Sequence, residues 1–234
     1  MNIAYRIKNM AKPEFALVFS KLAFRFIHIL MIPLRYKAKF RMLSHLIESL
    51  NPIVTANTTH GPIDFYCPAH WPFLGHYMRG PHILTWIDGF NDGDVLWDIG
   101  ANVGAYSLYA AKRGVQVIAF EPAAINYFIL ARNIEVNNMD SSIRGLNIAL
   151  HNERKLGYLY MEHTNLGSAQ HNFDSVWCSK RHTQKVIHRQ SVIAFSADEF
   201  LEEFDAPFPT HIKIDVDRNE ELIIVGAKKI LSDA

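Results

Sequence analysis

The sequence predicts an α/β protein built around a parallel β-sheet, and three observations support this. Short apolar runs of strand length occur at residues 95–99, 115–120 and 211–216. Longer stretches with helical periodicity separate them, and glycine or proline stands at several junctions. Strands that alternate with helices are typical of a parallel sheet with helices on its faces. The 234 residues, of which 49% are apolar, suit one domain with a substantial core and some extra structure.

Residues 1–50 predict a basic, amphipathic helical extension. They hold nine Lys and Arg against two acids, a balance of +7, which leaves −6 for the rest of the chain. Helical periodicity over residues 14–32 leaves one narrow polar stripe, which consists of Ser20, Lys21, Arg25 and His28. Pro33 is expected to end this helix. Peripheral membrane contact through residues 14–41 is one interpretation; a helix packed on the rest of the protein or on a partner is the other.

The composition argues against several classes of protein. A net charge of +1 gives no basis for nucleic-acid binding. The most apolar segment, residues 15–34, is interrupted by Lys21 and Arg25, so it falls short of the roughly 18 uncharged residues of a membrane span. Two cysteines, Cys67 and Cys178, do not make a disulfide framework. A cytoplasmic location is therefore expected, with the membrane periphery as the alternative.

Residues 51–90 predict a lead-in of strands and loops, with the best strand at residues 61–68. Four prolines argue against a long helix, namely Pro62, Pro68, Pro72 and Pro81. Several histidines lie near Cys67 and Cys178, but their spacing matches no compact zinc signature. Loop and surface positions are therefore favoured for these histidines.

Residues 91–234 form the regular α/β part of the predicted fold. The expected strands are residues 95–99, 115–120, 146–150, 156–161, 190–196 and 211–216. The expected helices are residues 105–113, 122–138 and 220–231. Gly114 is well placed to end the first of these helices, and Pro122 to begin the second.

A glycine-containing turn follows the first of these strands. Asp98 ends the strand, and Gly100 and Gly104 follow it. In an open parallel sheet, ligands bind beyond the carboxyl ends of the strands, where the strand order changes direction. Glycines there let backbone N–H groups approach a ligand closely. A dinucleotide site would have the spacing Gly-x-Gly-x-x-Gly, but Asn102 takes the place of the middle glycine.

Acidic residues at two strand ends narrow the class of ligand. Asp98 would repel a pyrophosphate but attract an ammonium group, and Glu121 can accept hydrogen bonds from two ribose hydroxyls. S-adenosylmethionine (SAM) offers an ammonium and a ribose and has no phosphate. The pattern therefore favours a SAM pocket. The alternative is that each acid caps the helix that follows it.

Blocks of sequence from about Gly61 to the end of the chain resemble the FkbM-type methyltransferases, which are class I SAM-dependent O-methyltransferases. These blocks are WIDGFNDGDVLWDIGANVGAYSLYAA, VIAFEP, NIAL with a following GSA, SVIAFSADEFL and HIKIDVDRNEELIIVGAKKIL. The resemblance implies a Rossmann-like fold and methyl transfer to a hydroxyl of a sugar, glycan, lipid-linked or polyketide-type acceptor. It places at the cofactor Asp98, Gly100, Ala101, Asn102, Gly104, Glu121 and Pro122.

The resemblance also implies that Asp215 lies where the methyl acceptor and the cofactor meet. A carboxylate there would orient the hydroxyl or accept its proton as a general base. A structural cap on the last helix is the alternative. A second alternative is that Asp215 and Asp217 hold a divalent metal. No third ligand is evident in the sequence, so we assign no metal site.

Two departures from the family pattern affect these expectations. Arg218 stands where the family usually has glycine, so a positive φ there would strain the backbone. A class I sheet normally has seven strands, and the sequence predicts a sheet truncated after the fourth core strand and its helix. Residues 211–216 would then form an exposed edge through which the chain associates.

Two other functions remain open at this point. One is a truncated, catalytically impaired SAM-binding or scaffold module. The other is a nicotinamide-dependent oxidoreductase, which the missing middle glycine at Asn102 disfavours.

Overall fold

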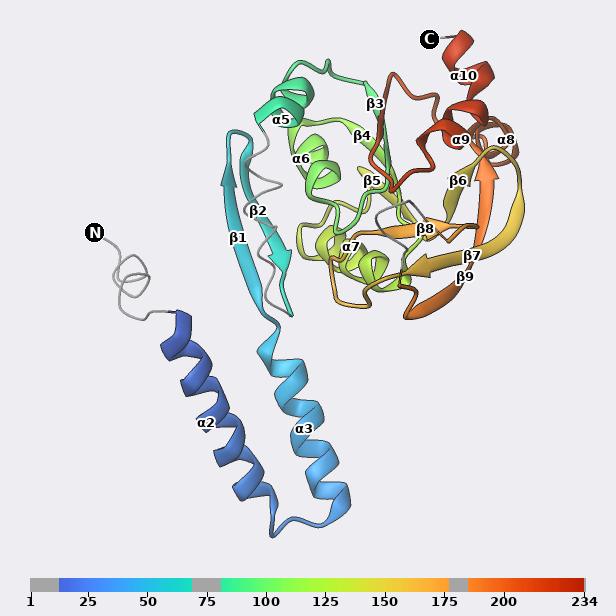
Figure 1. The fold of residues 1–234 in the computed structure, drawn as a ribbon. Coiled ribbons are helices and arrows are strands. Elements are labelled where there is room, and N and C mark those ends of the chain that lie inside the picture. Colours follow the sequence, from blue (N-terminus) through green and yellow to red (C-terminus); the bar gives the residue numbers. More distant parts are fainter. Residues whose placement is uncertain (1–12, 69–80, 177–184, 234) are drawn as a thin grey trace. The chain divides into compact units, whose positions relative to one another are not determined.

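The computed structural model describes residues 13–68, 81–176 and 185–233 (Figure 1). The chain divides into two compact units, Met1–Asn51 and Pro52–Ala234. Cys178 lies outside the described residues.

The first unit contains two helices, α2 (Pro13–Met31) and α3 (Tyr36–Leu50). The helix expected over residues 14–32 is confirmed. α2 ends two residues before Pro33, which cannot continue a helix because it lacks an N–H group. No side chain of α3 is buried. Within the described parts of the chain, no helix has the length and apolar character needed to cross a membrane.

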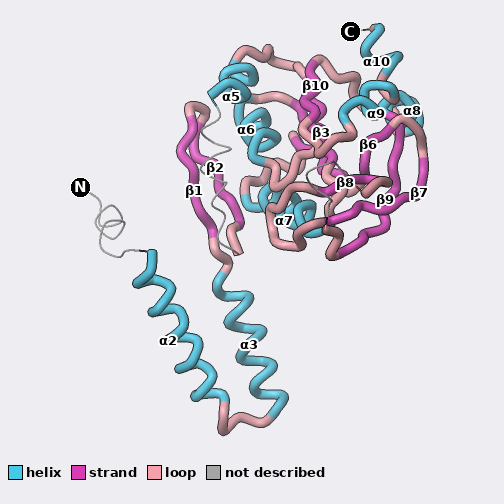
Figure 2. Tube along the Cα trace, in the orientation of Figure 1, coloured by secondary structure: helices cyan, strands magenta, loops and turns pink. Residues whose placement is uncertain are grey.

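A four-stranded parallel sheet forms the centre of the second unit, as the sequence predicts (Figures 1 and 2). Its strands are β3 (Val95–Ile99), β4 (Gln116–Phe120), β5 (Ile143–Leu146) and β10 (His211–Ile214). Their order across the sheet is β10-β3-β4-β5. The chain therefore proceeds in one direction from β3 to β5 and returns to the other side of β3 with β10. The change of direction between β3 and β10 marks the expected ligand position.

Side chains of the central strands are buried on both faces of the sheet. In β4, Val117 belongs to the core that contains α6 (Ala105–Arg113) and α7 (Ala124–Val136). Its neighbour Ile118 belongs to the opposite core, with α8 (Ala197–Glu203) and α9 (Glu220–Val225). Since alternate residues of a strand point to opposite faces, a sheet covered on both sides needs continuous apolar runs. This requirement explains why the strands of the parallel sheet appear in the sequence as continuous apolar runs and not as alternating patterns.

The described parts of the lead-in, residues 52–68 and 81–90, belong to the second unit. They form a hairpin of β1 (Ile53–Thr58) and β2 (Gly61–Tyr66), and then helix α5 (Pro81–Asp88). The expectation of strand and loop alone is wrong for α5, because Pro81 occupies the first position of a helix, where proline is tolerated. Side chains at the end of α7 and just after it hold the hairpin. Asn133 of α7 accepts from the N–H of Tyr66 at 2.7 Å, and Asn137, the residue after the helix, accepts from the N–H of Asp64 at 2.9 Å.

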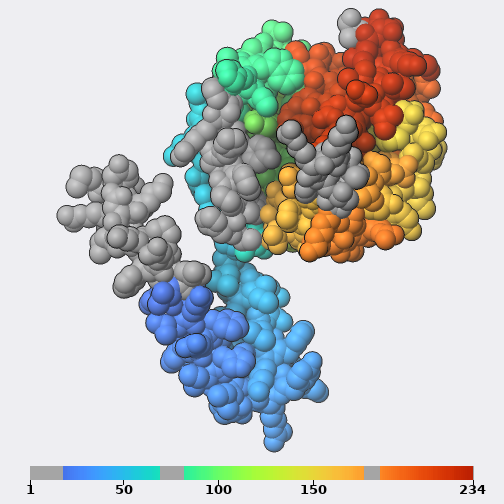
Figure 3. All heavy atoms as spheres, in the orientation of Figure 1, coloured from blue at the N-terminus to red at the C-terminus, as the bar shows by residue number. Residues whose placement is uncertain are grey.

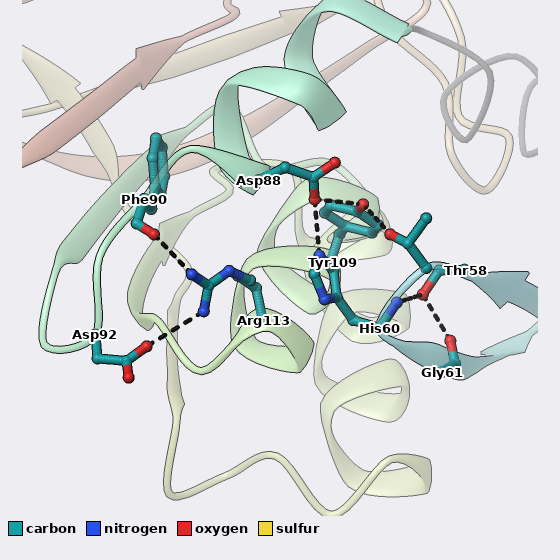
Figure 4. A network of polar contacts seen from close by, with 9 residues as sticks. Thr58, His60, Gly61, Asp88, Phe90, Asp92, Tyr109 and Arg113 are labelled. Carbon is teal, nitrogen blue, oxygen red and sulfur yellow. Dashed lines mark hydrogen bonds and ion pairs between the residues drawn. The ribbon is translucent and has the colours of Figure 1, made fainter.

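A polar network joins the hairpin and α5 to α6 (Figure 4). Asp88 accepts hydrogen bonds from His60 Nε2 and from the Tyr109 hydroxyl, both at 2.7 Å. These two bonds lower the pKa of the Asp88 carboxyl. Arg113, at the end of α6, donates to the carbonyl of Phe90 at 2.9 Å. The network fixes the segment that leads into β3.

The segment between β5 and β10 forms a second sheet, with the strand order β6-β9-β7-β8. Its strands are β6 (Ala149–His151), β7 (Lys155–Met161), β8 (His171–Phe173) and β9 (His188–Ser196). The single strand expected at residues 146–150 is therefore wrong: β5 ends at Leu146, and β6 begins at Ala149 in the other sheet. Between them, the Asn147 amide donates to the carbonyl oxygens of Glu121 and Pro122, at 2.8 and 3.0 Å. These bonds turn the chain from one sheet to the other.

The helix expected at residues 220–231 is divided into α9 and α10 (Lys228–Ser232). The division lies at Gly226, whose Cα packs on the backbone of β6. A Cβ at this position would lie 2.1 Å from the carbonyl oxygen of His151. Gly226 is therefore needed for close packing, since its φ of −80° is ordinary for any residue.

Gly226→Ala is expected to lower the free energy of unfolding by roughly 3 kcal/mol, because backbone on both sides prevents relaxation of the clash. Gly145→Ala is the matched control. Its Cβ would meet the flexible tip of Ile134 at 3.3 Å, so its cost should stay within about 1 kcal/mol. Urea denaturation of both variants measures the difference; equal stabilities would contradict the packing argument.

Candidate functional site

A cleft of about 740 Å³, open to solvent, lies beyond the carboxyl ends of β3, β4 and β10. The cleft brings together most of the residues that the sequence singles out. Its lining includes Gly100, Ala101, Asn102, Glu121, Pro122 and Asp215. The cleft is therefore the candidate site.

The loop after β3 follows a path that requires glycine. Gly100 and Gly104 have φ angles of +77° and +84°. A Cβ on Gly100 would lie 2.2 Å from the carbonyl oxygen of Asp215, and one on Gly104 would lie 2.4 Å from Leu130. Both glycines thus allow close contact with other parts of the protein. Asn102, in the middle position, also has a positive φ of 52°, which asparagine tolerates better than most residues.

Asp98 lies in the interior below the cleft and does not line it. One of its carboxylate oxygens accepts from Lys213 Nζ at 2.9 Å, and the other accepts from Ser107 Oγ at 2.6 Å. Asp98 was expected to bind the ammonium group of SAM, but both of its carboxylate oxygens already accept hydrogen bonds from side chains of the protein. One of these donors, Lys213, belongs to the cleft lining and was not predicted from the sequence.

The Lys213 ammonium is held among neighbouring charges. Burial alone would lower its pKa, but the carboxylates of Asp98 and Asp215 outweigh burial and raise the pKa. The Asp215 carboxylate lies 3.6 Å from Nζ, and the ring centre of Tyr106 lies 5.4 Å away. Lys213 thus stays charged and links the interior acid to the acid at the cleft.

Glu121 lies at the carboxyl end of β4, and its carboxylate is buried against the glycine loop. Oε2 accepts from the backbone N–H of Asn102 at 2.7 Å, and Oε1 accepts from that of Ala123 at 2.9 Å. Burial raises the pKa of Glu121 to about 7, although both backbone bonds favour the ionised form. The Asn126 side chain also hydrogen-bonds this carboxylate. A carboxylate can accept about four hydrogen bonds, so Glu121 can still accept one from a ligand.

Two buried polar atoms at the cleft have no hydrogen-bond partner among the described residues. They are Asn102 Oδ1 and His171 Nδ1. Burial lowers the pKa of His171, so its ring is neutral at pH 7. Unsatisfied buried polar atoms are costly and are often satisfied by a ligand or by water. His171 was not predicted from the sequence, because its place in the cleft depends on where the second sheet lies relative to the parallel sheet.

A loop from the second sheet closes one side of the cleft. The Asn126 amide donates to the carbonyl of Ser168 at 2.9 Å and accepts from the N–H of Gly167 at 2.9 Å. At the other end of the loop, Asp217 accepts from the N–H of His171 at 3.0 Å. The GSA sequence therefore lies over the glycine turn, held from α7 and from the turn after β10.

The turn after β10 carries the three remaining residues of interest. Asp215 lines the cleft, and its side chain is 60% exposed. Arg218 has a φ of 72°, so this position has the positive φ that would favour the glycine usual in the family. Asp217 accepts from the N–H of His171 and so holds the loop that carries the GSA sequence. Across the described ranges, no cluster of three or more His, Cys, Asp or Glu residues is arranged to hold a metal ion.

The parallel sheet, the glycine turn at the switch point and the buried acid after β4 define an α/β protein with a candidate ligand site at the carboxyl ends of its strands. Residues 98–234 match the profile of the methyltransferase FkbM domain, which is more than half of the chain. The chain belongs to the FkbM methyltransferase family.

Individual relatives match shorter parts of the chain. A stretch of 55 residues is 40% identical to methyltransferase sdnD of Sordaria araneosa and covers 23% of this chain. The matched part spans 21% of that curated relative. Among solved structures, the precorrin-6Y C5,15-methyltransferase of Geobacter metallireducens GS-15 matches with a TM-score of 0.38 and 14% identity, over 65% of this chain and 56% of that one. The C-terminal domain of the Rhodobacter capsulatus enzyme matches with a TM-score of 0.31 and 21% identity, over 36% and 44%.

Lys213→Met is expected to destabilise the protein by about 3–5 kcal/mol, because it leaves the Asp98 carboxylate buried without a countercharge. Adding Asp98→Asn should recover most of this loss, since an amide needs no countercharge and keeps an oxygen for Ser107. Urea denaturation of the single and double variants measures both effects.

Lys228→Met provides the control, because Lys228 is exposed and its loss should change stability by less than about 0.5 kcal/mol. A double variant no more stable than Lys213→Met would show that the charge of Asp98 is not what Lys213 stabilises.

Proposed function

We propose that this chain binds SAM in the cleft and transfers its methyl group to a hydroxyl of a sugar, glycan, lipid-linked or polyketide-type acceptor. The observation that carries the proposal is the buried Glu121 carboxylate at the end of β4, together with the buried Asn102 Oδ1, which has no partner among the described residues. Both are hydrogen-bond acceptors, which suit a ligand rich in donors, such as the ribose hydroxyls, adenine amino group and ammonium of SAM. Membership of the FkbM family supports the same cofactor.

The glycine loop argues against a dinucleotide in this cleft. In a dinucleotide site the N–H groups of the loop donate to a pyrophosphate. Here the N–H of Asn102 donates to Glu121 instead. The Asp215 carboxylate also lines the cleft and would repel a phosphate. A nicotinamide-dependent reaction is therefore disfavoured on structural grounds as well.

When bound, SAM supplies an electrophilic methyl group on its sulfonium. The residues of this chain would position the reactants and manage one proton. Glu121 would hold the ribose. Asp215, exposed at the cleft, would accept the proton that the acceptor hydroxyl loses when its oxygen takes the methyl group. Lys213 would orient Asp215 from inside the cleft.

Ionisation of Glu121 is expected to govern cofactor affinity near neutral pH. Its pKa is raised to about 7, and ribose hydroxyls donate best to the ionised carboxylate. Affinity for S-adenosylhomocysteine should therefore fall by up to about tenfold per unit below that pKa and stay level above it. Calorimetric titration of the full chain over this pH range measures the effect.

Glu121→Gln keeps the shape of the side chain and removes its titration, so its binding should be weaker and nearly independent of pH. Glu135→Gln, on the exposed face of α7, is the matched control and should follow the unmodified protein. Binding that is independent of pH in the unmodified chain would exclude Glu121 as the ribose acceptor. Binding of NADH without binding of S-adenosylhomocysteine would reject SAM as the cofactor.

Asp215→Asn is expected to slow methyl transfer by roughly 10²–10⁴-fold, because the amide cannot accept the proton of the hydroxyl. Affinity for S-adenosylhomocysteine should change less than about threefold, since the Asp215 side chain is largely exposed. Transfer of tritiated methyl from SAM to a panel of methyl glycosides and simple alcohols measures the rate.

Asp140→Asn, at an exposed position outside the cleft, is the control and should leave the rate unchanged. Equal rates for Asp215→Asn and the unmodified protein would remove Asp215 from the reaction. Cofactor binding without transfer to any acceptor of the panel would favour a SAM-binding module over an O-methyltransferase of these acceptors.

A further inference from the structure

Helix α3 carries a continuous seam of exposed apolar side chains. They recur with a spacing of four and three residues, which places them on one face of the helix. The seam consists of Tyr36, Phe40, Leu43, Ile47 and Leu50. Their side chains are between 39% and 82% exposed. Nothing in the described part of the first unit buries this face.

Helix α2 is exposed in the same way and is more apolar still. Its polar stripe is narrow, and Lys21, Arg25 and His28 recur along it at helical spacing. Most of the remaining surface is apolar, with exposed side chains that include Phe19, Leu22, Phe24, Phe26 and Ile29. In the space-filling view both helices of the first unit, in blue, present side chains along their visible length (Figure 3). Exposed apolar patches larger than a few hundred Å² usually mark an interaction site on a protein surface.

Cations border the apolar seam of α3. Lys37 and Lys39 fall on its two sides, and Arg35 and Arg41 stand at nearby positions. Residues 1–50 carry nine Lys and Arg against two acids. Long basic side chains can place their charges at lipid headgroups while their stems lie along an apolar surface. The unit thus combines an apolar face with a positive border.

We propose that residues 13–50 bind the surface of a membrane that contains anionic phospholipids, with the seam of α3 and the apolar face of α2 inserted at the headgroup boundary. The charge favours this occupant over a second copy of the chain. Pairing two seams would bring their cations together, and like charges in contact are unfavourable. An anionic bilayer satisfies both the apolar face and the cations. The inference does not depend on the proposed function of the cleft.

Sedimentation of the full chain with vesicles tests the proposal. Vesicles of phosphatidylcholine with about 30% phosphatidylserine should bind the chain, and pure phosphatidylcholine vesicles should bind it at least tenfold more weakly. Phe40→Ser with Ile47→Ser should weaken binding on the order of 100-fold, because two inserted side chains are lost. Leu156→Ser with Ile193→Ser removes a similarly exposed apolar pair from the second unit and should leave binding unchanged.

The contribution of charge is tested separately. Replacing Lys37, Lys39 and Arg41 by Gln should weaken binding by roughly 100-fold, since each cation near an anionic surface contributes about fivefold. The control has the same change of net charge on the second unit, through Gln at Arg144, Lys185 and Lys228, and should bind like the unmodified chain. Thermal unfolding checks that every variant keeps a folded second unit.

Three outcomes would overturn the proposal. The first is absence of binding to the anionic vesicles at low salt. The second is equal loss of binding in the control variants. The third is a dimer, detected by light scattering, that Phe40→Ser with Ile47→Ser dissociates while no vesicle binding is found; that result would assign the seam to a second copy of the chain.

Discussion

The buried ion pair between Asp98 and Lys213 fixes the part of the molecule on which the site depends. The two residues are direct partners in the pairing of β3 with β10, and both side chains are almost fully buried. A buried charge is tolerated only if its countercharge is well placed, because removing either one leaves the other without solvation. The pair therefore sets the register of the two strands at their carboxyl ends. The glycine loop and Asp215 begin from those ends, so their separation follows from this register.

Close contacts carry this constraint outward to the walls of the cleft. Gly100 allows the carbonyl of Asp215 to approach the loop, and no other residue would fit there without a shift of backbone. The Asn133 amide donates to the carbonyl of Val103 at 2.8 Å while its oxygen accepts from β2. Glu121 binds the N–H of Asn102 from the opposite side. The loop is thus held from three elements, and the cleft is shaped before any ligand enters it.

The sequence was sufficient for the elements that follow a local pattern. Strands β3, β4 and β10 and helix α6 appear where the apolar periodicity places them, because burial on both faces leaves a strong signal. The break between β5 and β6 was missed, since Leu146 and Ala149 belong to one apolar run and only the bonds of Asn147 separate them. Glu121 was found because it ends a strand. Lys213 and His171 were not, because their roles depend on residues more than 40 positions away.

Arg218 shows how the site retains a backbone conformation that its side chain disfavours. Its φ of 72° costs an ordinary residue about 1–3 kcal/mol and persists only where the surroundings enforce it. Both of its neighbours are fixed. The Asp217 carboxylate accepts from the N–H of His171, and the Asn219 amide donates to the carbonyl of Phe173 at 3.2 Å. Since His171 and Phe173 are the two ends of β8, this strand determines the path of the turn after β10. The second sheet therefore shapes the mouth of the cleft through backbone strain as well as through the side chain of His171, and arginine can occupy a position where the family usually has glycine.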